Sequence, residues 1–236
     1  MARLSRVVAL GLPHHVTQRG NARRPVFATD ADRLVYLDLL ASNCRLYHLS
    51  ILGFCLMSNH VHLIAVPRRV DALSQALRNA HGRYAAYLNA REGGSGHVWQ
   101  GRYYSCPLDD EHLWAALRYT ELNPVRAGMV AAADLYRWSS AAAHCDRPDH
   151  ALPLCVERAL WEHAWDAPSW RTFLEHADAA RDLDALRAST HSGRPLGAPE
   201  FVKSLERGLQ RSLVPRKGGR PRKPEIAADQ GALGFV

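Results

Sequence analysis

Two histidines separated by a single residue lie in the segment MSNHVHLI, residues 57–64. Because side chains alternate between the two faces of a β-strand, His60 and His62 share one face and Val61 points to the other. Two imidazoles on one face can bind a single metal ion. The alternative is a solvated strand face that carries two histidines without a ligand, and the spacing by itself is compatible with both.

A tyrosine and an asparagine form a second candidate constellation, in the segment LRYTELNPVRAG, residues 117–128. Tyr119 and Asn123 are four residues apart, so a helix that continues through Asn123 places them on one face, one turn apart. A tyrosine hydroxyl would then lie beside a polar oxygen ligand. The alternatives are a half-buried aromatic at position 119 and a helix terminator ahead of Pro124. The histidine pair upstream favours a functional role for Tyr119 and Asn123 over these structural alternatives.

The elements that would position these residues alternate between strand and helix over the first 145 residues. Periodicity, caps and turn residues predict strands over 14–21, 49–57, 60–66 and 98–105, and helices over about 30–46, 71–90 and 110–122. The order β-α-β-β-α-β-α is that of an α+β, ferredoxin-like split βαβ fold. We therefore expect an antiparallel sheet with helices packed on one face.

Charge divides the 236-residue chain into three segments. Residues 1–145, the predicted catalytic domain, carry 16 Lys and Arg against 10 Asp and Glu. Residues 146–190 carry 5 against 9 and are predicted to form an acidic helical appendage. Residues 191–224 carry 9 against 2 and open a basic, partly disordered DNA-binding tail that runs to residue 236. Such uneven positive charge favours a polyanionic partner, with nucleic acid preferred to a membrane surface.

Composition disfavours several classes of protein. No run approaches 18 apolar residues, so we expect no membrane span and a cytoplasmic location. The five cysteines contain no CxxC pair, which favours buried thiols in a reducing compartment over a disulfide framework. The sequence contains no GxxxxGK[ST] segment, so no ATP is indicated.

Four motifs together resemble one known family. They are HVTQRGN (15–21), MSNHVHLI (57–64), WQGRYYS (99–105) and RYTELNPVRAG (118–128). Their order resembles that of the single-tyrosine HUH transposases of small bacterial insertion sequences, most of all the REP-associated tyrosine transposases, over about residues 10–140. The resemblance implies that His60 and His62 bind a metal and that Tyr119 is the nucleophile. It also implies that Asn123 completes the metal site, at a position where the family often has Gln.

The resemblance implies an enzyme that cuts and rejoins single-stranded DNA near imperfect hairpins. A phenol, with an ordinary pKa of about 10, needs a nearby cation and an activated electrophile to react at neutral pH. A divalent ion held by two imidazoles and an amide oxygen keeps its charge and open positions, which favours Mg²⁺ or Mn²⁺. Attack by Tyr119 would leave a 5′-phosphotyrosine and a free 3′-OH.

Two other functions are compatible with the sequence. One is a non-catalytic regulator that binds DNA hairpins on the same fold, although binding alone needs neither the histidine pair nor Tyr119. The other is a small metallohydrolase with a water nucleophile, for which Tyr119 would be dispensable. Tyr103 and Tyr104 are rival nucleophiles, but a strand gives them no polar partner at i+4.

Further residues are predicted to contact DNA, which would place the protein at the nucleoid. A homodimer is a possible oligomeric state. Arg19, Arg102 and Arg126 are expected to bind phosphates, and Trp99, Tyr103 and Tyr104 to stack on unpaired bases. The tail segment GRPRK, with Arg220, Arg222 and Lys223, resembles a minor-groove AT-hook. The alternative for that segment is a solvated tail.

The uneven charge generates a prediction about the tail. Deletion after about residue 190 should weaken DNA binding and spare the active site, because the deleted segment holds none of the proposed catalytic groups. The log–log salt slope of binding should become shallower by about 0.7 for each single-strand phosphate that the tail neutralises. Binding titrations over a range of salt concentrations measure this slope. A reduced single-turnover cleavage rate at saturating DNA, with an unchanged slope, would instead place the tail over the site.

Overall fold

The computed structural model describes residues 6–147, 152–154, 156–176 and 180–214. Two 3-10 turns lie between its longer elements, at Asn21–Arg23 and Ala133–Leu135. In chain order the strands and α-helices are β1 (His14–Arg19), α1 (Asp30–Tyr47), β2 (Leu49–Met57), β3 (His60–Pro67), α2 (Ala72–Glu92), β4 (Tyr104–Pro107), α3 (Asp110–Glu121), α4 (Asn123–Arg126), α5 (Ala141–His144), α6 (Ala159–Ala164), α7 (Ala167–Glu175), α8 (Ala180–Ser192) and α9 (Pro199–Leu209).

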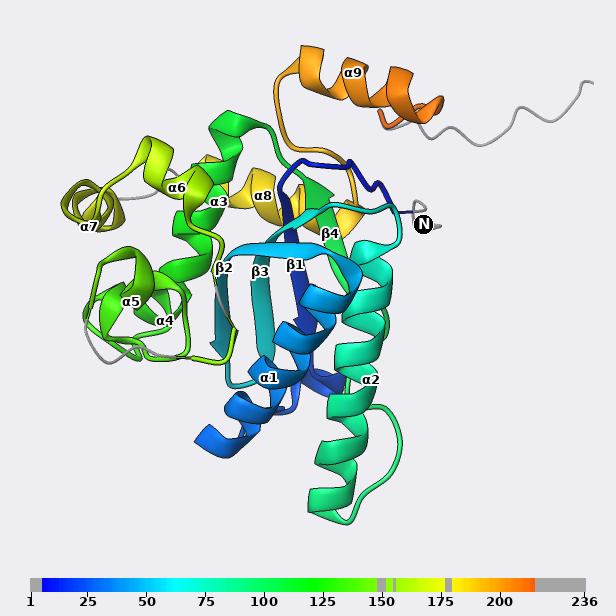
Figure 1. Ribbon diagram of the computed structural model, residues 1–236, viewed down its shortest axis with the longest axis vertical. Helices are drawn as coiled ribbons and strands as arrows, with labels where there is room; N and C mark the ends of the chain where they lie inside the picture. The colour runs from blue at the N-terminus through cyan, green and yellow to red at the C-terminus, as the bar shows by residue number, and fades with distance from the viewer. Residues whose placement is uncertain (1–5, 148–151, 155, 177–179, 215–236) are drawn as a thin grey trace, which may run out of the picture.

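The strands form one antiparallel sheet in the order β2-β3-β1-β4 (Figure 1). With α1 and α2 as the crossover helices, this is the split βαβ arrangement, so the α+β, ferredoxin-like fold class is confirmed. Two strands are shorter than predicted. β1 ends at Arg19 and does not reach residue 21, and the segment 98–105 is a strand only from Tyr104 onward. Gly101 has a φ of +106°, which interrupts the extended backbone ahead of β4.

Local signals explain where α1 begins and ends. The helix starts with a capping box in which the Thr29 hydroxyl accepts the Asp32 N–H and the Asp32 carboxylate accepts the Thr29 N–H. It ends at His48, whose φ of 55° is left-handed. Arg91, near the end of α2, donates to the same Asp32 carboxylate and so ties the two crossover helices together.

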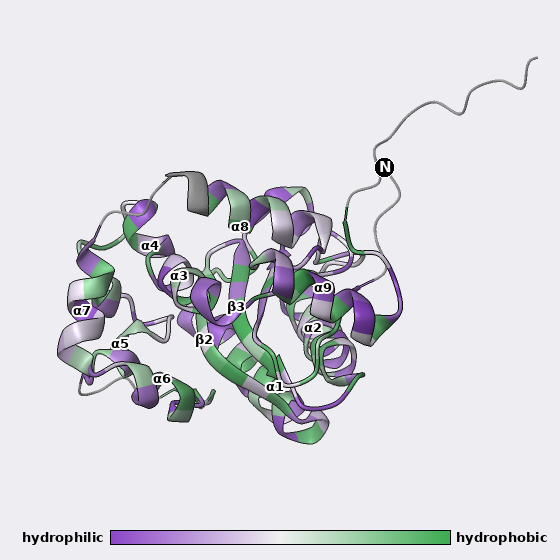
Figure 2. Ribbon diagram, turned by 90° about the horizontal axis from the view of Figure 1, so that it is seen from above, coloured by the Kyte–Doolittle hydropathy of each residue, from purple (hydrophilic) through white to green (hydrophobic). Residues whose placement is uncertain are grey.

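Different helices cover the two faces of the sheet, so the expectation that helices pack on one face only is wrong (Figure 2). The two crossover helices pack on the face that carries Val61 and Leu63, as predicted. α3 and α8 lie over the opposite face, in a core that includes Ile64. Gly53 of β2 permits the close approach of α3, because a Cβ at this position would lie 2.1 Å from Leu117 Cδ1. We call this second surface the α3 face, and the histidine pair lies on it.

A buried carboxylate ties α3 to the C-terminal helices. Glu121 has no exposed surface. Its Oε1 accepts hydrogen bonds from the Ser140 hydroxyl at 2.5 Å and from His144 Nδ1 at 2.6 Å, and its Oε2 accepts the Trp170 indole N–H at 2.8 Å. The Ser140 oxygen also accepts the backbone N–H of Phe54 in β2. The sheet, α3, α5 and α7 therefore meet at one carboxylate.

The segment from α8 onward contacts the β4 edge of the sheet. α8 packs against β4 and β1. Leu196, which follows it, donates its backbone N–H to the Pro107 carbonyl at 2.9 Å and accepts the Asp109 N–H at 3.2 Å. The end of the predicted acidic appendage and the start of the predicted tail thus both touch the ferredoxin-like unit. The division at residues 145 and 190 into separate domains stays a prediction.

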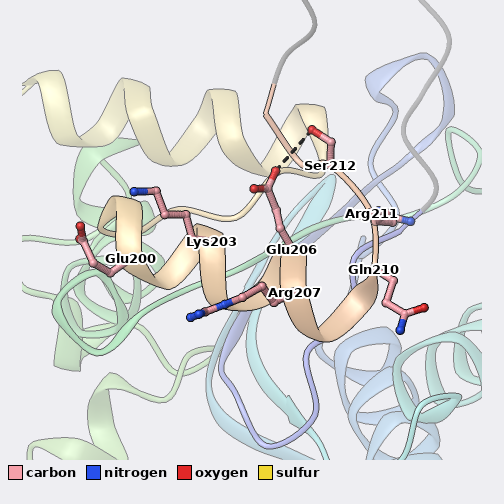
Figure 3. A pocket seen from close by; sticks show the side chains of 7 residues that line it. All are labelled: Glu200, Lys203, Glu206, Arg207, Gln210, Arg211 and Ser212. Atoms are coloured by element: carbon pink, nitrogen blue, oxygen red, sulfur yellow. Dashed lines mark hydrogen bonds between the residues drawn. The ribbon is translucent and has the colours of Figure 1, made fainter.

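α9 lies outside this packing, and none of its residues is buried (Figure 1). The chain turns back after it, so that the Glu206 carboxylate accepts the Leu213 N–H at 2.6 Å and the Ser212 hydroxyl at 3.4 Å (Figure 3). Glu206 therefore closes the end of the helix. The adjoining hollow of about 650 Å³ is lined by Glu200, Lys203, Glu206, Arg207, Gln210, Arg211 and Ser212.

The cysteines match the expectation of buried thiols. Cys44, Cys55, Cys106 and Cys145 are buried free thiols, while Cys155 lies outside the described residues. Burial raises the pKa of the Cys106 thiol to about 12, so it stays protonated. Among the helices that the structure describes, none is long and apolar enough to cross a membrane.

The Glu121 contacts generate a prediction about stability. Glu121→Gln should lower the free energy of unfolding by about 3 kcal/mol, because an amide NH₂ would replace an acceptor oxygen and face a buried donor. Urea denaturation followed by tryptophan fluorescence measures the change. The matched change Glu111→Gln, at the exposed start of the same helix, should cost less than about 1 kcal/mol. Equal effects of both substitutions would contradict the role of the buried carboxylate.

Candidate active site

An open cleft of about 550 Å³ lies on the α3 face of the sheet. Side chains from β1, the first 3-10 turn, β3, β4 and the loop before it, α3, α4 and α8 line it. They are His15, Thr17, Gln18, Arg19, Arg23, His60, His62, Gln100, Tyr104, Tyr119, Asn123, Arg187, Thr190 and His191. The structure thus brings the predicted histidine pair, Tyr119 and Asn123 together in one cleft.

Strand pairing adds a third histidine to the predicted pair. Thr17 of β1 is paired with His62 of β3, and paired residues present their side chains on the same face. His15 lies two residues before Thr17 and therefore shares that face. Its Nε2 is 3.0 Å from Nδ1 of His62, and the two rings stack with their centroids 5.3 Å apart.

α3 carries Tyr119 over these histidines. The Tyr119 ring meets His62 and His15 edge to face, with centroid separations of 5.5 and 5.7 Å. Arg126 lies over the ring, with its Cζ 4.3 Å from the centroid. Arg187 of α8 donates from Nε to the Tyr119 hydroxyl oxygen at 3.4 Å. Two guanidinium groups are therefore placed to stabilise negative charge on or near that oxygen.

Asn123 begins α4, one turn beyond Tyr119. Its amide nitrogen donates to the backbone carbonyls of Tyr119 at 3.1 Å and Thr120 at 3.2 Å. Because the nitrogen is directed at the main chain, the amide oxygen is the atom that Asn123 can offer to a ligand. These two bonds hold the Asn123 side chain in place.

A neighbouring amide determines which nitrogen of His60 carries the proton. The Asn59 amide nitrogen donates to the Arg23 carbonyl at 3.0 Å, so the amide oxygen is the atom directed at His60. That oxygen lies 2.6 Å from His60 Nδ1 and can only accept, so Nδ1 is protonated. The lone pair of His60 is consequently on Nε2, where a metal ion can use it.

Burial keeps the three histidines neutral. It lowers the pKa of His15 to about 3. Burial, assisted by the positive charge of Arg19, lowers the pKa of His60 to about 4. The pKa of His62 is also lowered, by burial first and then by the neighbouring His15 and His60. Neutral imidazole is the form that binds metals, so at neutral pH no proton has to be displaced.

The donor set fits a divalent ion with open coordination positions. Two neutral imidazoles and one amide oxygen leave the ion its full charge and room for substrate oxygens. Within the described part of the chain, no group of three or more His, Cys, Asp and Glu side chains could hold a metal ion.

The predicted DNA-binding residues fall into three groups. Arg19 lines the cleft, and Arg126 contacts the Tyr119 ring and its backbone carbonyl. The structure does not bring Arg102, Trp99 and Tyr103 into the cleft. Their part in DNA binding stays a prediction, as does that of Arg220, Arg222 and Lys223, which lie outside the described residues.

The two buried aromatics outside the cleft are held by contacts of their own. Trp99 is 8% exposed, and its indole N–H donates to the His81 carbonyl at 3.0 Å. Tyr103 is 6% exposed, and the Arg6 guanidinium lies over its ring at 3.8 Å from the centroid. A base could stack on either ring only after these covering groups moved.

Among the cleft residues that sequence reasoning missed are His15, Arg187, Thr190 and His191. His15 had a usable signal, because it alternates with Thr17 and Arg19 in a predicted strand and could have been paired with the His-x-His strand. The three α8 residues gave none, since they lie in a segment interpreted from its charge as an appendage. They lie far from the four motifs in sequence, so no local pattern could place them in the cleft.

The position of α8 changes how the tail has to be deleted. A cut after residue 190 removes His191, whose ring stacks on Tyr104 with centroids 4.8 Å apart, and it removes Leu196 from the β4 edge. The expectation that such a cut spares the site is therefore wrong. A deletion that starts at residue 215 removes five basic residues of the tail and leaves these contacts intact.

Comparisons with known proteins bear on the family and the fold of the chain. The sequence model described as "Transposase IS200 like" matches residues 10–123. No curated protein matches the sequence. Among solved structures, the chain is similar to a REP-associated tyrosine transposase bound to a REP hairpin, at 18% identity and a TM-score of 0.54, over 66% of this chain and 93% of that one.

A candidate transposase from Deinococcus radiodurans is also similar, at 18% identity and a TM-score of 0.35, over 50% of this chain and 95% of that one. The first likeness supports the fold, and the second is too low to bear on it.

The histidine geometry generates a prediction about metal binding. His60→Ala and His62→Ala should each raise the dissociation constant for Mn²⁺ by more than the roughly 10- to 100-fold typical of an outer partner, since each change removes a ligand. Asn123→Ala should have a smaller effect, because water can replace one neutral oxygen. Electron paramagnetic resonance of free Mn²⁺ measures the affinity. His163→Ala, at an exposed position on α6, is the control, and an equal effect there would contradict the site.

Proposed function

Since the chain belongs, through residues 10–123, to the family of IS200-like transposases, we propose that it is a metal-dependent DNA strand transferase of the single-tyrosine HUH class. Its substrate is single-stranded DNA beside a hairpin, and its covalent intermediate is a 5′-phosphotyrosine. The observation that carries the proposal is the contact of the Tyr119 ring with His62, in a cleft that arginines line.

Tyr119 is the nucleophile of this reaction. Its hydroxyl oxygen forms a bond to the phosphorus atom while the bond from phosphorus to the 3′ oxygen breaks. The phenol loses its proton to solvent and the departing 3′ oxygen gains one, so a free 3′-OH remains. The phosphotyrosine retains the free energy of the phosphodiester, so attack by a 3′-OH reverses the step and rejoins strands without ATP.

Arginines prepare the cleft for a phosphate and for the attack. Arg187 donates to the Tyr119 oxygen, so its positive charge stabilises negative charge there as the proton leaves. Arg126 packs on the ring and bonds the Tyr119 carbonyl, which limits the rotation of the side chain. Arg19 and Arg23 line the same cleft and are placed to bind backbone phosphates of the DNA.

His60 and His62 are the metal ligands of the proposed site, and the amide oxygen of Asn123 is the third. When bound, Mg²⁺ or Mn²⁺ neutralises a non-bridging phosphate oxygen as negative charge develops on it. The fixed Nδ1–H of His60 and the lowered pKa values of His60 and His62 keep the ligand nitrogens unprotonated at neutral pH.

Single-stranded DNA near a hairpin is supported as the substrate by two observations. The cleft carries arginines, and within a chain of net charge +7 the short segment 191–224 alone has 9 Lys and Arg against 2 Asp and Glu. The similar solved transposase is bound to a REP hairpin. In this proposal the ferredoxin-like unit performs the chemistry and the basic tail adds affinity.

Two rival functions give different results in one assay. A regulator without turnover would bind hairpin DNA and leave it intact. A metallohydrolase with a water nucleophile would cleave the DNA without forming a covalent adduct. Incubation of labelled single-stranded hairpin DNA with the protein and Mn²⁺, followed by a denaturing gel, separates these outcomes from the proposed one.

The proposed nucleophile generates a prediction. Tyr119→Phe should abolish both cleavage and the covalent adduct while DNA affinity and thermal stability remain close to those of wild type, because only one oxygen is removed. The denaturing gel detects the adduct, and mass spectrometry locates it. Tyr104→Phe is the matched control, since Tyr104 lines the same cleft, and it should keep the adduct. An adduct that survives in Tyr119→Phe and maps to Tyr103 or Tyr104 would overturn the assignment.

A further inference from the structure

We infer that Thr190 and His15 are positioning residues for the proposed metal site, which together set the protonation pattern of His62. The inference rests on the proposed function, because it concerns the metal ligand that this function requires. It assigns a role to α8, which lies beyond the residues that the family model matches. Neither residue touches the reacting atoms, and both act through the ring of His62.

A continuous chain of hydrogen bonds joins His62 to the backbone of α8. His62 Nδ1 lies 3.0 Å from His15 Nε2, and His15 Nδ1 lies 2.7 Å from the Thr190 hydroxyl oxygen. The Thr190 hydroxyl in turn donates to the Leu186 carbonyl at 2.7 Å. Both His15 and Thr190 are buried, at 2% and 3% exposure, so water does not compete for these partners.

The direction of every bond follows from the last acceptor. A main-chain carbonyl cannot donate, so the single proton of the Thr190 hydroxyl points to Leu186. The hydroxyl oxygen therefore accepts from His15, whose proton is on Nδ1. His15 Nε2 then has a lone pair and accepts from Nδ1 of His62. Each imidazole is neutral and carries one proton, so no other arrangement satisfies all three bonds.

The result for His62 is a lone pair on Nε2. This is the same protonation pattern that Asn59 imposes on His60, so both ligands of the pair present the nitrogen that a metal ion needs. If the chain of bonds ran in the opposite direction, His15 would donate to His62 Nδ1. His62 would then carry its proton on Nε2 and could not bind the ion without exchanging that proton.

Packing keeps the hydroxyl in place. α8 lies against β4, and the Cys106 thiol of that strand is 3.3 Å from the Thr190 oxygen. Leu186 is 3% exposed and belongs to the core of the α3 face. The helix is therefore seated on the sheet by apolar contacts, while the position of a single hydroxyl determines the protonation of His15.

The test replaces the Thr190 hydroxyl with a methyl group in the full-length protein. Thr190→Val keeps the shape of the side chain and should raise the dissociation constant for Mn²⁺ by about 10- to 100-fold, as outer partners of metal ligands typically do. Thr190→Ser keeps the hydroxyl and should restore the affinity to within about threefold of wild type. Cys106→Ala removes the other contact of this hydroxyl and should leave the affinity unchanged.

A second readout needs no metal. In metal-free protein labelled with ¹⁵N-histidine, the nitrogen shifts of His62 should report a proton on Nδ1 in wild type and in Thr190→Ser. In Thr190→Val they should report a mixture of the two forms. His15→Phe, which removes the acceptor altogether, should shift the same signals. A purely structural role for Thr190 would alter stability without moving them.

The two readouts distinguish failure of the inference from failure of the proposed function. Wild-type protein that binds no Mn²⁺ would overturn the metal-dependent function, while the nitrogen shifts would still test the chain of bonds. Wild-type protein that binds Mn²⁺ and cleaves DNA, together with a Thr190→Val variant of unchanged affinity and unchanged shifts, would overturn the inference alone.

Discussion

The carboxylate of Glu121 is withdrawn from solvent, so both of its oxygens have to be satisfied by protein donors. The donors are Ser140, His144 and Trp170, which follow Glu121 by 19, 23 and 49 residues along the chain. Tyr119 precedes Glu121 by two residues on the same helix. The position of Tyr119 over the histidines therefore depends on the docking of elements that follow residues 10–123, which the family model matches. A substitution that removes this carboxylate would displace α3 and with it Tyr119.

The two faces of the sheet differ in polarity, and the cleft lies on the more polar one. The crossover helices bury an apolar face with few polar side chains, whereas the α3 face combines an apolar end with a polar end. Close packing at the apolar end, where Leu117 sits against Gly53, fixes the distance of α3 from the strands. The same separation between α3 and the strands applies at the polar end of this face. It keeps the Tyr119 ring in contact with the rings of His15 and His62.

Much of the fold and part of the site could be predicted from local patterns. Alternation in β3 located His60 and His62 on one face, and helical spacing joined Tyr119 to Asn123, since both depend on residues near one another in sequence. Arg187 and Thr190 could not be found in this way, because their role comes from the docking of α8 on β4. Trp99 was assigned to DNA by its residue type, but its burial is decided by long-range packing with α2 that no local pattern records.

The bonds between His62 and α8 end on the main chain, and this has a consequence for how the site tolerates change. A carbonyl of the backbone is present whatever side chain occupies position 186, so its accepting character is insensitive to mutation there. The hydroxyl at position 190 is sensitive to mutation, because serine is the only other residue that carries an aliphatic hydroxyl. Two homologous chains with superimposable backbones could consequently differ in metal affinity through one atom, and a comparison of Cα positions would not reveal it.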